Sequence, residues 1–290
     1  MAQLPQEFLT RMQDMLGDEF DAFLTSYDAP RTAGLRVNTK KCRTEDFPPL
    51  VPGTWKKIPW IPNGYFVPDG MRMGQSPLYA AGVFYLQEPS AMTPASRLPI
   101  EPGERVLDLC AAPGGKSFAM AMEMGNRGDI LSCDIHPHKL KLIENGAARL
   151  GITIVRTALA DGRERHAAWV EQADVVLADV PCSGLGIIRK KPDIRWKDPA
   201  ALAALPAIQR AILGNAAAYV RPGGVLVYST CTVLPEENGG VVTDFLSGHP
   251  EFVKEDFDLP GIGSCSGDAT LWPQRTRTDG FYICRMRRRA

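Results

Sequence analysis

The amino-acid sequence predicts an α/β fold built on a mostly parallel β-sheet. From Arg105 onward, apolar runs typical of buried strands alternate with amphipathic stretches typical of helices, as parallel β-α-β units require. The first of these units has a glycine-rich turn between its strand and its helix. The composition fits a protein with a sizeable core, since 44% of the 290 residues are hydrophobic and 23% are charged.

The first strand–turn–helix unit covers residues 105–117 and reads R-V-L-D-L-C-A-A-P-G-G-K-S. Its apolar start is typical of a buried strand, and Pro113-Gly114-Gly115 ends that strand before a helix begins. Turns of this kind present backbone N–H groups and a helix N-terminus to a nucleotide-like ligand. Glycine is favoured there because the ligand approaches the backbone more closely than a Cβ atom permits.

The turn matches neither of the two common phosphate-binding patterns. A P-loop requires glycine five places before Gly115, where this sequence has Cys110, and no G-x-G-x-x-G is present. An adenosyl ligand without a pyrophosphate remains, such as S-adenosylmethionine. Asp134 ends the next expected strand, twenty positions after Gly114, and can accept the ribose hydroxyls. The alternative interpretation is an ordinary tight turn and a helix-capping Asp134.

The same alternation continues through the second part of the chain. Expected strands are 105–109, 129–133, 152–156, 174–179 and 223–229, with helices at 116–124, 137–150, 205–220 and 235–247 and two further strands at 251–255 and 280–286. Ligands in parallel sheets bind at the carboxyl ends of the strands. Asp161 and Asp179 follow the third and fourth expected strands, so we expect both carboxylates near the ligand.

The amino-terminal part has a different character. Residues 1–27 carry apolar side chains at helical spacing, and residues 34–38 alternate as in a strand. Residues 47–77 are dense in Pro, Gly, Trp and Tyr, which indicates irregular structure with a few short strands. We therefore place a boundary between this part and the α/β part near residue 95.

The overall charge is balanced, with 33 Lys and Arg residues against 33 Asp and Glu residues. Any contact with nucleic acid must therefore be made by a local patch. One such patch precedes residue 45, where basic residues outnumber acidic ones. Its members are Arg31, Arg36, Lys40, Lys41 and Arg43. An ordinary solvated face and a phosphate-binding surface are equally good interpretations of this run.

The seven cysteines are odd in number and contain no C-x-x-C, which argues against a disulfide framework and against a zinc site. The sequence shows no signal peptide and no apolar run of membrane length. We therefore expect a cytoplasmic protein with reduced thiols. Cys133, Cys265 and Cys284 are expected to act as small buried hydrophobic residues.

Cys182 and Cys231 differ, because both lie in polar turns at the expected ligand edge of the sheet. A thiolate there can act as a nucleophile if its pKa is lowered, and Lys116 is a candidate source of positive charge. A methyltransferase needs such a nucleophile for C5 of a pyrimidine, which is too electron-poor to accept a methyl group directly. Thiolate addition at C6 makes C5 nucleophilic, so that C5 can attack the sulfonium methyl group. A base then removes the C5 proton, and the thiol leaves.

Three long motifs resemble those of a known family. L-D-L-C-A-A-P-G-G-K, A-D-V-P-C-S-G and Y-S-T-C-T-V-L-P-E-E-N occur in this order, followed by L-W-P and T-D-G-F-Y. They resemble the Nop/Sun family of RNA cytosine-5 methyltransferases. P-R-T-A-G-L-R-V-N-T and Y-L-Q-E-P-S-A-M are similar to its bacterial RsmF-type branch, which modifies small-subunit ribosomal RNA.

The resemblance implies a class I S-adenosylmethionine-dependent methyltransferase fold. This fold is Rossmann-like, with a mostly parallel seven-stranded sheet and a small α+β, RRM-like amino-terminal part. We expect residues 1–95 to form the helical and RRM-like RNA-binding part, and residues 96–290 the catalytic domain. Members of the branch usually continue into an RNA-binding domain of the PUA-like kind, whereas this sequence ends at R-M-R-R-R-A.

The resemblance also implies roles for individual residues. Cys231 matches the nucleophile that attacks C6, and Cys182 matches the cysteine that assists product release. Lys116 and Asp179 match residues that hold the target cytosine. The residues that match the cofactor-binding set are Cys110, Ala111, Ala112, Pro113, Gly114, Gly115, Lys116, Asp134, Asp161 and Asp179. The implied cofactor is S-adenosylmethionine, the implied partner is RNA, most simply ribosomal RNA, and the expected state is a monomer.

Three other functions stay open at this point. A tRNA cytosine-5 methyltransferase would use the same chemistry on another RNA. A DNA cytosine-5 methyltransferase would use Cys182 as its nucleophile and would not need Cys231. An inert RNA-binding scaffold would need neither thiol.

Overall fold

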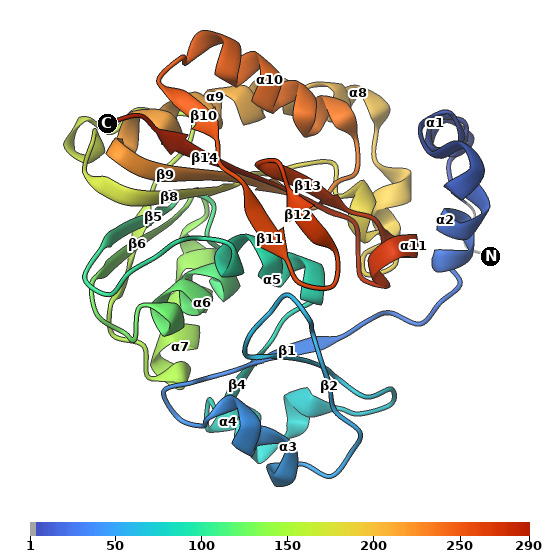
Figure 1. Ribbon diagram of the computed structural model, residues 1–290, viewed down its shortest axis with the longest axis vertical. Helices are drawn as coiled ribbons and strands as arrows, with labels where there is room; N and C mark the ends of the chain where they lie inside the picture. The colour runs from blue at the N-terminus through green and yellow to red at the C-terminus, as the bar shows by residue number, and fades with distance from the viewer. Residues whose placement is uncertain (1–3) are drawn as a thin grey trace.

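An eight-stranded sheet runs through the centre of the protein in the computed structural model, which describes residues 4–290 (Figure 1). Its strands follow the order β10-β14-β9-β8-β5-β6-β7, and β13 pairs with β14. The parallel strands are β5 (Arg105–Asp108), β6 (Asp129–Asp134), β7 (Val155–Leu159), β8 (Ala173–Asp179) and β9 (Val220–Thr230). The antiparallel strands are β10 (Phe252–Lys254), β13 (Asp268–Leu271) and β14 (Phe281–Arg288). The predicted class I fold is confirmed.

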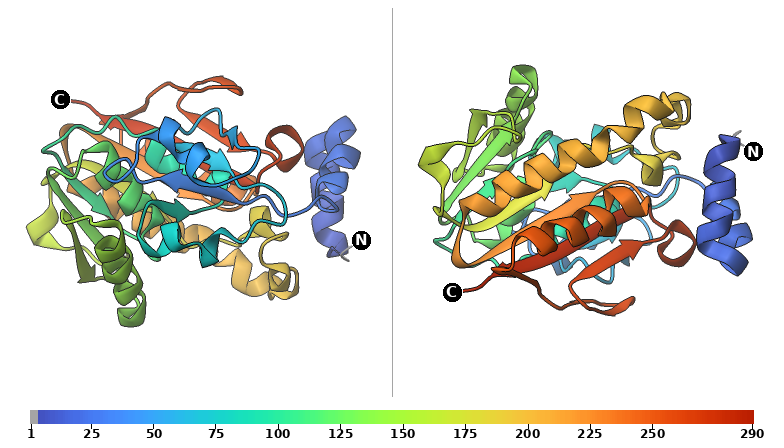
Figure 2. Two further views of the ribbon diagram at one scale, coloured as in Figure 1. Left: turned by 90° about the horizontal axis from the view of Figure 1, so that it is seen from below. Right: turned by 90° about the horizontal axis from the view of Figure 1, so that it is seen from above.

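Helices cover both faces of this sheet (Figures 1 and 2). On one face lie α5 (Pro89–Ser96), α6 (Gly115–Glu123) and α7 (Pro137–Leu150); on the other lie α9 (Leu205–Tyr219) and α10 (Gly239–Gly248). Along each strand, successive side chains point to opposite faces of the sheet, so neighbouring residues belong to two different cores. Val106, Val175 and Val225 are neighbours in register and pack into the core that contains α6 and α7. The residues that follow them belong to the core that contains α9 and α10.

The predicted elements agree best with the structure where the elements are long and buried. The helices predicted at 116–124, 137–150 and 205–220 lie within one residue of α6, α7 and α9 at each end. The strand predicted at 152–156 is wrong, since β7 covers Val155–Leu159. β7 is an edge strand with no buried residue, so hydrophobicity carries little signal there.

Two helical predictions differ from the structure at glycine or proline. The helix predicted at 235–247 is a short 3₁₀ turn, Pro235–Glu237, followed by α10. The helical region predicted at 1–27 is two helices, α1 (Gln6–Leu16) and α2 (Phe20–Ser26), separated by a 3₁₀ turn that begins at Gly17. Residues 1–3 lie outside the described part of the chain. Both helices pack against residues 185–194 of the α/β part.

A small antiparallel sheet precedes α5, with strand order β2-β3-β1-β4 (Figure 1). Its strands are β1 (Gly34–Val37), β2 (Lys56–Lys57), β3 (Gly64–Phe66) and β4 (Phe84–Leu86), with short helices α3 (Phe47–Leu50) and α4 (Pro77–Ala80) beside it. This sheet has its own core around Leu35, Phe47 and Phe84. Ile58, Trp60 and Ile61 belong instead to the core of the large sheet, so the two parts are packed together.

The remaining elements are short. They are α8 (Pro199–Ala203), α11 (Pro273–Thr276) and a hairpin of β11 (Phe257–Leu259) and β12 (Gly263–Cys265). Within residues 4–290, none of the helices is both long enough and apolar enough to cross a membrane.

Candidate active site

The residues singled out in the sequence gather where the parallel strands end. Cys110 follows β5, Asp134 ends β6, Asp161 follows β7, and Asp179 ends β8. The last residue of β9, Thr230, is followed directly by Cys231. Because parallel strands share one carboxyl edge, a single site can use side chains that are far apart in the chain.

The glycine turn after β5 leaves the start of α6 open to a ligand. Gly114 caps the helix with a φ of +102°, and no side chain at this cap bonds the first-turn N–H groups. A Cβ atom on Gly114 would lie 2.5 Å from the Phe118 ring. A Cβ atom on Gly115 would lie 2.9 Å from the ring of Tyr85 and 3.0 Å from the amide of Gln87. The turn therefore needs both glycines, and the N–H groups at the start of α6, which have no side-chain cap, remain available to an anionic or polar group.

Asp134 lies beside this turn with 7% of its surface exposed. Its Oδ1 atom accepts a hydrogen bond from the backbone N–H of His136 at 2.9 Å, which fixes the carboxylate at the strand end. Ile135 follows it and is 48% exposed, although it is a large apolar residue. A carboxylate beside an exposed apolar side chain fits the ribose and the base of an adenosyl group.

Asp161 lies at the same edge, because the neighbouring Ala160 N–H bonds the carbonyl oxygen of Asp134 at 3.2 Å. Its carboxylate is paired with the Arg163 guanidinium at 2.5 Å. This hydrogen-bonded cation lowers the pKa of Asp161, so the carboxylate stays ionised. The predicted position of Asp161 thus agrees with the structure, while its partner Arg163 carries no sequence signal that we recognised.

The two cysteine sulfurs of the site lie 3.3 Å apart, Cys182 on the turn after β8 and Cys231 on the turn after β9. The hydrogen bond from Cys182 lowers the pKa of the Cys231 thiol. The same hydrogen bond, together with burial, raises the pKa of Cys182. Cys231 is therefore the thiol that ionises first, and Cys182 keeps its proton.

Lys116 and Asp179 lie beside the cysteine pair. The Lys116 ammonium is 2.5 Å from Oδ2 of Asp179, and the Ser229 hydroxyl donates to Oδ1 of Asp179 at 2.7 Å. The Lys116 nitrogen is also 5.3 Å from the centre of the Phe281 ring. A cation and a carboxylate held in fixed positions can bind the polar edge of a heterocyclic base.

A buried network below the site holds both cysteine turns. The Glu237 carboxylate is 2% exposed and accepts hydrogen bonds from the Ser183 N–H and the Gln209 amide, both at 2.8 Å. The Ser183 hydroxyl donates to the Thr232 hydroxyl at 2.8 Å. These bonds connect the residue after Cys182 with the residue after Cys231, so the two sulfurs keep their separation.

The predicted basic surface needs a correction at Arg36. Its guanidinium is 1% exposed and donates to Asn63 Oδ1, the Met92 carbonyl and the Ser96 hydroxyl. Arg36 therefore joins β1 to α5 inside the protein and is not available to RNA. The reason lies in its position within a strand that is buried on both faces.

The other members of the predicted basic surface are exposed, with different surroundings. Lys41 donates to the carbonyls of Ala81 and Arg149, and Arg43 pairs with Asp46. Arg31 and Lys40 are exposed. The charge of Arg31 acts on Lys190 and Asp279, so Arg31 lies near these two residues.

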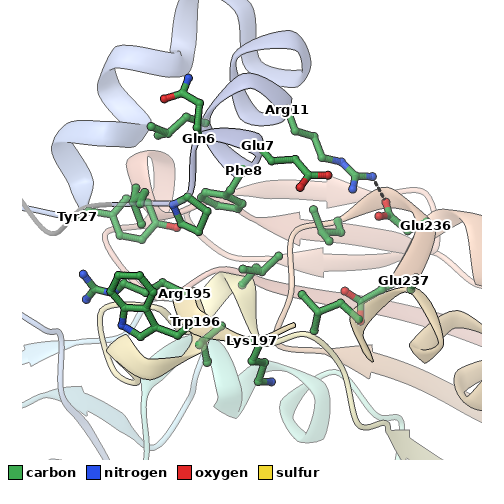
Figure 3. Close-up of a pocket in the computed structure, with 18 of the residues that line it drawn as sticks. Gln6, Glu7, Phe8, Arg11, Tyr27, Arg195, Trp196, Lys197, Glu236 and Glu237 are labelled. Carbon is green, nitrogen blue, oxygen red and sulfur yellow. Dashed lines mark hydrogen bonds and ion pairs between the residues drawn. The ribbon is translucent and has the colours of Figure 1, made fainter. Parts of the chain in front are cut away.

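A cavity of about 1180 Å³ lies between α1, α2 and the segments 194–197 and 234–237 (Figure 3). Figure 3 shows Tyr27, Arg195 and Trp196 along one side of it. None of its described lining residues is one of the cysteines at the sheet edge. Glu237 lines the cavity and also bonds the Ser183 N–H, so the cavity lies behind the Cys182 turn rather than at the site itself.

Two family models match the chain. The model for 16S rRNA methyltransferase RsmB/F matches residues 95–287, and the model for the N-terminal domain of 16S rRNA methyltransferase RsmF matches residues 4–89. The second match ends where α5 begins, and the first covers the large sheet.

Curated proteins similar to this chain include two ribosomal RNA small subunit methyltransferases F. The protein of Enterobacter sp. (strain 638) is 37% identical over 305 residues, which covers 99% of this chain and 63% of that protein. The protein of Erwinia tasmaniensis is 37% identical over 303 residues, with 98% and 63% covered. The chain thus spans less than two thirds of the length of these relatives.

Solved structures give the same fold. The crystal structure of PH0851 has a TM-score of 0.89 and 31% identity, and covers 98% of this chain and 66% of its own. A methyltransferase homologue from Pyrococcus horikoshii has a TM-score of 0.86 and 27% identity, and covers 99% of this chain and 96% of its own. Both similarities extend over the small sheet as well as the large one.

Proposed function

This chain belongs to the RsmB/F family of 16S rRNA methyltransferases, as the motifs predicted, and we propose that it methylates C5 of a cytosine in RNA, with small-subunit ribosomal RNA as its substrate. Methyltransferases of this family use S-adenosylmethionine, in agreement with the cofactor expected from the glycine turn. The relatives of this chain are named for ribosomal RNA, which favours that substrate over tRNA. We place the protein in the cytoplasm, where its thiols stay reduced, and propose that it acts as a monomer.

The residues at the sheet edge fit the cofactor. The uncapped first turn of α6 suits a polar or charged terminus, the Asp134 carboxylate suits ribose hydroxyls, and exposed Ile135 suits the flat face of a base. When bound, S-adenosylmethionine supplies an electrophilic methyl group on a sulfonium. Cys110 is partly exposed at the turn, and Asp108 is fully buried behind it, so these two side chains shape the site.

The observation that carries the proposal is the cysteine pair with its opposite pKa directions. The Cys231 thiolate is the nucleophile that adds to C6 of the cytosine and makes C5 nucleophilic. Lys116 and Asp179 hold the polar edge of the base so that C6 faces the sulfur. After methylation at C5, a base takes the C5 proton, the C5–C6 double bond re-forms, and the C6–S bond breaks to release Cys231 as a thiolate. Cys182, whose sulfur lies 3.3 Å from that of Cys231, assists this elimination.

The roles of the two cysteines can be distinguished by the covalent adducts that each variant forms with RNA. Cys231→Ala is expected to abolish methyl transfer and every adduct. Cys182→Ala is expected to leave attack intact and slow the release, so that a protein–RNA species accumulates and survives denaturing gel electrophoresis. Wild type and both variants are incubated with S-adenosylmethionine and RNA, including an RNA that carries 5-fluorocytidine, whose C5 cannot lose a proton. The products are compared on one gel.

Each rival function predicts a different gel. A mechanism of the DNA-methyltransferase type predicts that the adduct is lost in Cys182→Ala and retained in Cys231→Ala. An inert scaffold predicts no adduct with 5-fluorocytidine in any variant. Bisulfite sequencing of small-subunit rRNA and tRNA, from cells with and without the gene, distinguishes the two RNA substrates.

A further inference from the structure

The segment from Gly186 to Lys191 is hydrogen-bonded directly to the backbone of the proposed nucleophile, Cys231. The Gly186 N–H donates to the carbonyl of Cys231 at 3.1 Å, and the Gly280 N–H donates to the carbonyl of Gly186 at 2.7 Å. A Cβ atom on Gly186 would lie 2.2 Å from the Gly280 oxygen and 2.9 Å from the Cys231 oxygen. The three backbones are therefore in contact, and the segment is hydrogen-bonded to the Cys231 turn.

Arg189 holds the other end of this segment. Its side chain is 6% exposed and donates to the Ser26 carbonyl at 3.2 Å and the Thr278 carbonyl at 2.7 Å. It also forms an ion pair with Asp279 at 3.3 Å. Buried arginines with several acceptors have little freedom, so Arg189 sets the position of the residues that follow it.

Lys190 and Lys191 follow this anchor and are exposed, as is Arg31 on the segment between α2 and β1. Thr32, next to Arg31, donates to the carbonyl of Arg277 at 2.6 Å, which connects this segment to the turn between α11 and β14 that contains Gly280. Although Lys190 is exposed, partial burial lowers its pKa, and the nearby charge of Arg31 lowers it further, so these two cations lie near each other. Within the described residues, none of the three side chains has an ion-pair partner.

The acids near these cations do not cancel their charge. Asp279 already pairs with Arg189. Burial raises the pKa of Glu88 to about 7, so this carboxyl is only partly ionised near neutral pH. The cluster of Arg31, Lys190 and Lys191 thus keeps a net positive charge beside the Cys231 turn. Most other exposed arginines of the protein, such as Arg43 and Arg156, are paired with carboxylates.

We propose that Arg31, Lys190 and Lys191 bind the backbone phosphates on either side of the target cytidine. This inference rests on the function proposed above, because a base positioned at Cys231 places its own phosphates at the rim of the same site. Unpaired, exposed cations are the groups that bind a phosphodiester backbone without reading its sequence. Their attachment to Cys231 through Gly186 sets the register of the RNA relative to the nucleophile.

The test removes charges from the protein, from the RNA, or from both, and compares the effects on binding. The probe is a short single-stranded RNA with one 5-fluorocytidine, made either with natural linkages or with uncharged methylphosphonates at the two linkages that flank it. Binding is measured by fluorescence anisotropy for wild type and for Lys190→Ala/Lys191→Ala. We expect each change alone to weaken binding about tenfold, and the two together to weaken it no further. The double substitution is also expected to reduce the salt slope of log K by about 1.4.

The matched control removes two exposed cations from the opposite edge of the sheet. Arg105 and Arg127 lie where the parallel strands begin, and Arg105→Ala/Arg127→Ala is expected to leave binding and the methylphosphonate effect unchanged. Circular dichroism melts verify that both double variants are folded. Additive losses from the lysine substitutions and the methylphosphonates would overturn the proposed phosphate site, as would an equal effect in the control.

The same samples separate this inference from the proposed function. A wild type that forms the covalent adduct but shows additive losses contradicts the phosphate site alone. A wild type that forms no adduct with 5-fluorocytidine contradicts the proposed function, on which the phosphate site depends.

Discussion

Cys182 and Cys231 are the same residue type in neighbouring turns, yet their pKa values move in opposite directions. Only one proton fits between two sulfurs 3.3 Å apart, so stabilising one thiolate keeps the other thiol protonated. The charges of Lys116 and Lys191 add to this effect at Cys231, while Asp179 opposes it. The choice of nucleophile is thus made by surroundings rather than by residue type.

This arrangement predicts the pH dependence of alkylation. A lowered pKa means that Cys231 is ionised at pH values where an ordinary thiol, with a pKa of 9.0, is protonated. Iodoacetamide pulses across about pH 6–9, read by peptide mass spectrometry, are expected to modify Cys231 with a midpoint below 9. Cys182→Ala removes the hydrogen bond that lowers this pKa most, so the midpoint should rise. Faster modification of Cys182 than of Cys231 in the wild type would contradict the assignment.

At the scale of elements, the start of α6 has no side-chain cap at Gly114 and no acidic residue in its first turn, which leaves this helix end open to a ligand. Orphan N–H groups at a helix start need a partner, and a bound ligand can provide it. Tyr85 lies in β4 and Gln87 directly follows it, and both side chains lie within about 3 Å of where a Gly115 Cβ atom would be, so the small sheet also shapes this turn.

Two glycine substitutions test this element. In Gly115→Ala the new methyl group clashes with Tyr85 and Gln87, so the turn must shift, and we expect S-adenosylmethionine to bind at least about tenfold more weakly by calorimetry. Gly214→Ala is the matched control, because Gly214 lies inside α9 with open space around it. It should leave the affinity unchanged and stabilise the protein by about 0.5–1 kcal/mol. Equal affinities for S-adenosylmethionine in the two variants would show that the turn is not part of the cofactor site.

At the scale of the whole molecule, the small sheet and the α/β part share buried groups. Ile58, Trp60 and Ile61 pack into the large core, and the Asn38 side chain donates to the carbonyl of Leu150 at the end of α7. Arg36 adds hydrogen bonds from β1 to α5. With so many buried groups common to both parts, we expect them to unfold together.

Substitution of Arg36 tests this coupling. Arg36→Ala leaves a cavity and deprives Asn63 and Ser96 of their donor, so we expect a loss of about 2–4 kcal/mol in the free energy of unfolding. Lys40→Ala, at an exposed neighbouring position, should change it by less than about 0.5 kcal/mol. Denaturant unfolding followed by fluorescence and by circular dichroism should show one shifted transition in Arg36→Ala. Two separate transitions would show that the parts are not coupled.

The sequence by itself determined the fold class, the order of the buried elements and the edge of the sheet that holds the site. These follow from local patterns, since apolar periodicity reports burial and strand ends in a parallel sheet share one edge. Cys182 and Cys231, 49 residues apart, could be placed together on that basis. The tertiary structure alone decided what surrounds each side chain. Arg36 and Lys190 look equally basic in sequence, but Arg36 is buried against Ser96, 60 residues away, whereas Lys190 is exposed beside the site. Burial and pairing depend on such distant partners, which no local pattern contains.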